Sequence, residues 1–151
     1  MFDAAKFSRA QFEPRTARVE VPDLAQWFGD EPPVFVVRGL TAFELARAAD
    51  AEAKNKQLGS VVEVLSSVSQ SEQVAALKDQ LGLGDATHPE IAKRIEHLVM
   101  GSVEPVLTMD VAVKLATVYP AEFYQLTNQI IALTGKGQAE KKRGSSGGML
   151  E

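Results

Sequence analysis

The chain contains no cysteine among its 151 residues. This absence excludes disulfide frameworks, thiolate metal sites and cysteine nucleophiles together. Histidine is scarce too: His88 and His97 are the only two. Their spacing places them on opposite faces of a helix, so they cannot share a metal ion, and we expect a first-turn polar residue and a helix-surface residue. We therefore predict a protein that is not an enzyme, with no catalytic residue, no metal site and no cofactor.

Long apolar runs are missing as well. The longest, such as residues 34–37, are far too short to span a bilayer. The first six residues lack the apolar run of a signal peptide, so we expect a cytoplasmic protein with no membrane partner. A net charge of −4 and a pI near 5.3 argue against nucleic-acid binding. A DNA-binding helix pair around Tyr119 and Pro120 is disfavoured too, because residues 120–134 contain no basic residue.

The composition that remains is that of an ordinary globular protein, with 45% hydrophobic and 24% charged residues. We predict a single domain over residues 1–135, with a strand-containing part at 1–39 and a helical part at 40–135. Residues 136–151 are rich in Gly, Ser and Lys and have too few apolar side chains to offset the entropy of ordering. We expect them to form a flexible tail.

Two short segments near the N-terminus have the pattern of β-strands. Apolar and charged residues alternate in 17–21, and residues 34–38 are β-branched and aromatic. Residues 23–28 between them predict a helical turn, followed by a Gly/Pro loop. Two strands alone are marginal in water, so we expect an antiparallel ribbon that packs on a helix.

Beyond Gly39 the pattern is helical. Thr41 and Glu44 have capping-box spacing and open a helix that extends to about Gln57. Further helices are predicted over 60–81, which could be two helices, and after Thr87, Thr108 and Pro120. The expected fold class is mostly α with a small N-terminal β-ribbon (α+β), about five helices and a C-terminal helix pair.

Apolar helical surface is the most prominent feature that could bind another protein. The last helix carries an apolar stripe, and two aromatic residues adjoin the Pro-rich loop. Such a stripe and such aromatics also serve as core, and most of the apolar surface must do so. The candidate interaction residues are Phe123, Leu126, Ile130, Trp27 and Phe28.

Two segments resemble the tail assembly chaperones of long-tailed bacteriophages. Residues 35–44, FVVRGLTAFE, resemble the strand-into-helix entry of that family. Residues 119–137, YPAEFYQLTNQIIALTGKG, resemble its closing helix and are the more specific match. The resemblance covers residues 34–137 in order and length, whereas residues 55–108 match by helical character only. It carries over no binding residue.

The resemblance implies a morphogenesis protein of the host cytoplasm that is absent from the mature virion. Such chaperones bind the tape measure protein, keep it soluble and are displaced as the tail tube protein polymerises. Self-association is a further expectation. The alternative function is a minor structural or completion protein of the phage tail.

Members of that family are often also made in a longer form by ribosomal frameshifting. An adenine-rich slippery codon run over residues 140–143 would permit such a product here. A coding sequence without a slippery heptamer before the stop codon would reject the hypothesis.

Overall fold

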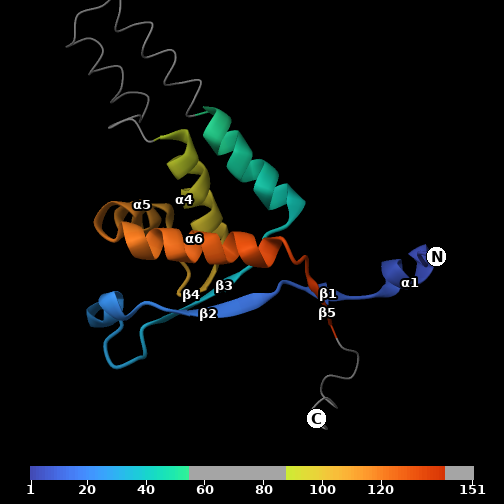
Figure 1. The fold of residues 1–151 in the computed structure, drawn as a ribbon, viewed down its shortest axis with the longest axis horizontal. Helices are drawn as coiled ribbons and strands as arrows, with labels where there is room; N and C mark the ends of the chain where they lie inside the picture. Colours follow the sequence, from blue (N-terminus) through green and yellow to red (C-terminus); the bar gives the residue numbers. More distant parts are fainter. Residues whose placement is uncertain (55–87, 142–151) are drawn as a thin grey trace, which may run out of the picture.

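The alternating residues near the N-terminus form part of a small antiparallel sheet, beside which the helices pack (Figure 1). The computed structural model describes residues 1–54 and 88–141, and in them the fold is α+β, as predicted. The strands and the short 3-10 helix are β1 (Phe12–Glu13), β2 (Thr16–Glu20), η1 (Pro22–Trp27), β3 (Val34–Arg38), β4 (Ser102–Glu104) and β5 (Ala139–Glu140). The α-helices are α1 (Ala4–Arg9), residues 42–54, α4 (Pro89–Gly101), α5 (Met109–Val118) and α6 (Pro120–Thr134).

The predicted ribbon is confirmed by β2 and β3, which pair antiparallel with Val19 opposite Phe35. Burial alternates along β3, so Phe35 and Val37 are buried while their neighbours are partly exposed. Strand β4 adds a third strand in the order β2-β3-β4. The sequence did not predict β4, because three residues directly after a helix are too few to show a period of two.

Helix α6 is the centre of the helical layer. It contacts α4 and α5 and lies across β2 and β3 (Figure 1). Its predicted stripe is buried, with Phe123, Leu126 and Ile130 at most 1% exposed. Gly101 at the end of α4 permits close packing, because a Cβ there would lie 2.6 Å from Cδ1 of Ile130.

The start of α4 differs from the expectation. The predicted cap Thr87 and the predicted helix at 60–81 lie outside the described residues. The N-cap is His88, whose Nδ1 accepts a hydrogen bond from the Glu90 amide at 3.1 Å.

His97 is buried at 5% exposure, so its prediction as a surface residue was wrong. Its place on α4 looked polar in sequence, but the fold covers that face.

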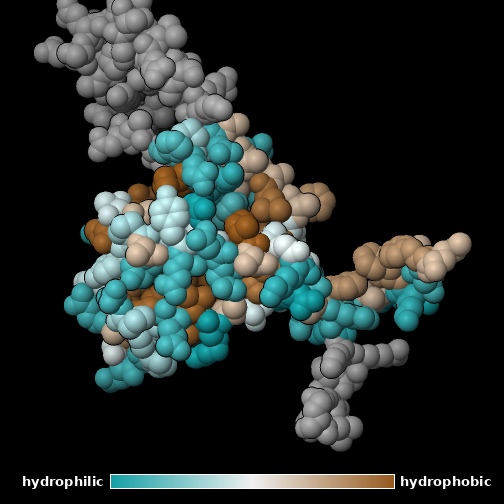
Figure 2. Space-filling model, viewed as in Figure 1, coloured by the Kyte–Doolittle hydropathy of each residue, from teal (hydrophilic) through white to brown (hydrophobic). Residues whose placement is uncertain are grey.

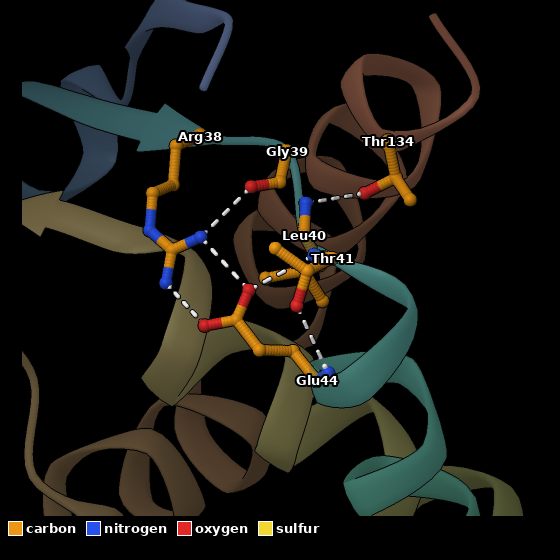
Figure 3. Close-up of polar contacts among 6 residues, drawn as sticks. All are labelled: Arg38, Gly39, Leu40, Thr41, Glu44 and Thr134. Atoms are coloured by element: carbon orange, nitrogen blue, oxygen red, sulfur yellow. Dashed lines mark hydrogen bonds and ion pairs between the residues drawn. The ribbon is translucent and has the colours of Figure 1, made fainter. Parts of the chain in front are cut away.

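Two segments meet at a joint between β3 and the last turn of α6 (Figure 3). Gly39 lies so close to α6 that a Cβ there would be 3.0 Å from the backbone carbonyl carbon of Leu133. The Leu40 amide donates a hydrogen bond to Thr134 Oγ1 at 2.9 Å. A glycine and a hydroxyl residue are therefore what this close approach requires.

The predicted capping box lies at the same joint and is confirmed. The Glu44 amide donates to Thr41 Oγ1 at 3.2 Å, and the Thr41 amide donates to Glu44 Oε1 at 3.0 Å. Arg38 donates two hydrogen bonds to the Glu44 carboxylate, at 3.0 and 2.6 Å (Figure 3). The hydrogen bonds from Arg38, followed by those from Thr41, lower the pKa of Glu44 to about 2.

The first residues of the chain leave the body as a projection (Figure 1). Strand β1 pairs with β5, and the Lys141 amide donates to the Gln11 carbonyl at 2.7 Å. The pairing of Ala139 and Glu140 orders part of the segment predicted to be flexible, and residues 142–151 lie outside the described residues. Beyond this pairing lies the N-terminal arm, residues 1–11, in which α1 buries no residue.

Candidate functional site

An open groove of about 890 Å³ lies between η1, the start of β3 and α5. Its walls are mainly apolar and come from segments distant in sequence. Cavities of roughly 300–1,000 Å³ with apolar walls and a few polar groups are typical of binding sites. Its apolar lining includes the side chains of Trp27, Phe28, Phe35, Val111, Leu115 and Val118.

The η1 wall is built by a buried anchor and an exposed tip. Pro22 is at the first position of this 3-10 helix, and Leu24 is buried in the core. Because the helix is short, anchoring Leu24 leaves Trp27 pointing outward, and its side chain is 69% exposed. Phe28 is half-buried against the Phe35 ring, with 6.0 Å between ring centroids. Of the two aromatic side chains from this wall, Phe28 therefore packs on Phe35 and Trp27 is accessible to a ligand.

The opposite wall is the outer side of α5. Ala112 and Leu115 face the core, as an amphipathic helix requires. Val111 and Val118 line the groove, and each is 51% exposed. Val113, on the same helix and 44% exposed, is not part of the groove. Helix α5 therefore presents apolar side chains to solvent as well as to the core, and two of them line the same groove as Trp27.

Charged side chains also line the groove. Three are acidic and two are basic, and all five are exposed. A groove lined by apolar side chains together with exposed charged ones fits a ligand that is apolar on one side and charged on the other. The five are Glu31, Glu104, Asp110, Arg18 and Lys114.

The structure separates the predicted interaction residues into two groups. Phe123, Leu126 and Ile130 are in the core, where they contact other elements of the chain and expose almost no surface. Trp27 and Phe28 line the groove. The sequence left open whether Trp27 is a core residue or an exposed binding residue, and its side chain is 69% exposed.

Sequence reasoning missed Val111 and Val118. Helix α5 follows Thr108 as predicted, and Thr108 Oγ1 accepts a hydrogen bond from the Val111 amide at 3.3 Å. The available signal was an excess of apolar residues, because α5 also carries Val113 and Met109 on its exposed sides. A helix that buries one face only does not need that many.

The second exposed apolar feature is the N-terminal arm. The Phe2 and Phe7 rings stack at 5.3 Å between centroids, and Phe7 stacks on Phe12 at 5.4 Å. Phe2 is 72% exposed and Phe7 54%. Figure 2 shows the arm as a largely apolar projection with one hydrophilic patch. Exposed contiguous apolar surface of this kind marks interaction sites.

Possible metal ligands do not cluster in the described part of the chain. Within residues 1–54 and 88–141, no three acidic or histidine side chains come together in a way that would hold a metal ion. Burial lowers the pKa of His97, and the Lys93 and Arg94 charges lower it further. Its Nδ1 has no hydrogen-bond partner among the described residues. This histidine is therefore a neutral interior group away from the groove residues.

In the described part of the chain, no helix is both long enough and apolar enough to cross a bilayer. In comparisons with known proteins, no family model, no curated protein and no solved structure matches this chain.

Proposed function

We propose that this protein is a tail assembly chaperone of a long-tailed bacteriophage. It acts in the host cytoplasm, binds the tape measure protein through the apolar groove and keeps that client soluble. The client is released as the tail tube protein polymerises around it, and the chaperone is absent from the mature virion.

The observation that carries this proposal is the exposed apolar groove with Trp27, Val111 and Val118 on its walls. A long helical client with apolar faces aggregates unless those faces are covered. A groove with an apolar floor and charged edges fits an amphipathic helix, which buries one face and keeps the other in water. The groove therefore has the shape and polarity that such a client needs.

The family resemblance supports the proposal in a different way. Residues 35–44 and 119–137, which carry the resemblance, meet at the joint where Leu40 donates to Thr134. The two segments that carry the resemblance therefore contact each other in the fold. Phe35 and Tyr119 of these segments also line the groove, whereas Trp27, Val111 and Val118 come from outside them. The resemblance carries over no binding residue, so the client-binding residues are assigned from the groove.

Co-expression with the tape measure protein tests the proposal. We expect the chaperone to raise the soluble fraction of the client severalfold. Val111→Asp places a charge in the groove and should abolish this effect. Val113→Asp is the matched control, because Val113 has similar exposure on the same helix but does not line the groove. A client that stays insoluble with the wild-type chain would reject the proposal.

Mass spectrometry of purified phage particles separates the chaperone from the alternative function. A minor structural or completion protein would be present in finished particles at a fixed number of copies. The chaperone should be missing from them and present in lysates during assembly.

A further inference from the structure

We propose that the N-terminal arm of one copy binds in the apolar groove of a second copy. The occupant of the groove in the free protein is thus residues 1–11 of a neighbouring chain. This inference goes beyond the proposed function, since it concerns the protein without its client.

The arm has the properties of a segment that needs a partner. Helix α1 has six residues and buries none of them. Isolated helices shorter than about 12–15 residues are marginal in water, so packing must supply the missing stability. Phe2 and Phe7 form an aromatic pair that stays exposed, at 72% and 54%, although Phe7 also contacts Phe12 of β1. Large rigid aromatics are the usual anchors of protein interfaces.

The groove is apolar, as the exposed rings of the arm are, and it can take up several side chains. Its volume of about 890 Å³ is in the range of sites that enclose several side chains. The arm carries Lys6 and Arg9 in the last turn of α1, and the carboxylate of Asp3 already accepts the Lys6 amide.

The groove's charges complement those of the arm. Acidic side chains outnumber basic ones along the groove, with Glu31, Glu104 and Asp110 against Arg18 and Lys114. A basic amphipathic segment with aromatic anchors is the complement of such a surface.

Geometry favours a second copy over the arm of the same chain. In Figure 1 the arm and η1 lie at opposite ends of the described part of the chain, and the arm points away from η1. The base of the arm is held by the pairing of β1 with β5 and by the hydrogen bond from Lys141 to Gln11. An arm at one end and a groove at the other produce head-to-tail contacts between copies.

Sedimentation velocity of the full chain without a client is the first test. We expect concentration-dependent association of the wild type. Phe2→Ser combined with Phe7→Ser, and separately Val111→Asp, should weaken association roughly tenfold or more. Phe43→Ser and Val113→Asp are the controls: Phe43 is 88% exposed, and neither residue lies in the arm or the groove. A wild type that stays monomeric, or controls that dissociate equally, would overturn the proposal.

Mixing the two variants gives a sharper result. The arm variant keeps an intact groove, and the Val111→Asp variant keeps an intact arm. Each should sediment as a monomer alone, and the mixture should form a one-to-one dimer, because one productive contact remains. A mixture that stays monomeric would contradict the inference.

Trp27 supplies a direct probe, because it is the only tryptophan in the chain and lines the groove. A synthetic peptide of residues 1–13 contains no tryptophan. Added to the monomeric arm variant, it should shift Trp27 emission saturably, and the Phe2→Ser, Phe7→Ser peptide should not. An unchanged spectrum would count against docking in the groove. The client plays no part in these measurements, so their failure is distinct from failure of the chaperone proposal.

Discussion

Two neighbouring helices use apolar side chains in different ways. Helix α6 buries most of its large apolar side chains, with Phe123, Leu126 and Ile130 almost fully buried, and exposes only Tyr124 (39%) and Ile131 (41%). Helix α5 buries only Ala112 and Leu115 and leaves valines exposed on its other sides. Folding alone accounts for the apolar stripe of α6. It does not account for the exposed valines of α5, which is why we assign binding to the groove beside α5.

The largest expected effect is at α6. Phe123→Ala removes a ring with 1% exposure, so it should lower the free energy of unfolding by about 3–5 kcal/mol. Trp27→Ala, at an exposed aromatic, should stay within about 0.5 kcal/mol of the wild type. Urea unfolding followed by circular dichroism measures both. Equal losses would contradict the distinction between core and groove.

The contact between α4 and α6 should be the next most sensitive. Gly101→Ala forces a methyl group against buried Ile130, so we expect a loss of about 1–3 kcal/mol by overpacking. Gly135→Ala is the control, because a Cβ there meets its nearest atom at 3.6 Å. Thermal unfolding should separate the two variants, and a stable Gly101→Ala chain would show that this contact is loose.

The joint between β3 and α6 predicts a smaller effect with a defined pH dependence. Glu44→Gln should cost about 1–2 kcal/mol at pH 7, because a charge-assisted pair with Arg38 is lost at a partly exposed site. The folded pKa of Glu44, about 2, is below its ordinary value of 4.5. Its stabilisation is therefore present above pH 4.5 and is lost as the pH falls towards 2.

Urea titrations of the wild type and Glu44→Gln at pH 7 and pH 2.5 test this dependence. The difference between the two chains should shrink at the lower pH. Exposed Glu20→Gln serves as a control with little effect. A difference that is independent of pH would rule out the carboxylate as its source.

The smallest effect concerns His97. Burial lowers its folded pKa below the ordinary 6.5, so the unfolded chain takes up the proton first as the pH falls. Stability should therefore decrease on acidification below pH 6.5, by less than about 1.4 kcal/mol per pH unit for one group. Unfolding midpoints at pH 7 and 5.5 should differ less in His97→Gln than in the wild type. An unchanged difference would show that another group titrates.

The correct predictions came from local patterns in the sequence. Alternation in residues 17–21 and the β-branched and aromatic residues of 34–38 predicted the β2–β3 ribbon. The spacing of Thr41 and Glu44 predicted a helix start, and an apolar stripe predicted the buried face of α6. Each depends on residues within a few positions of one another, so tertiary context was not needed.

The missed features depend on contacts between distant residues. Strand β4 exists because β3 lies beside it, and β5 because β1 does. The burial of His97 and the exposure of Trp27 are set by which elements pack over them, which residue type alone does not determine. The groove was missed for the same reason, since its walls come from η1 and α5, far apart in the chain.

The most direct test of a client-binding groove is a titration of Trp27 fluorescence with helical segments of the tape measure protein. We predict saturable binding to the wild type and to Val113→Asp, and binding to Val111→Asp that is roughly tenfold weaker or lost. Equal affinity for all three chains would contradict the assignment of the groove as the binding site.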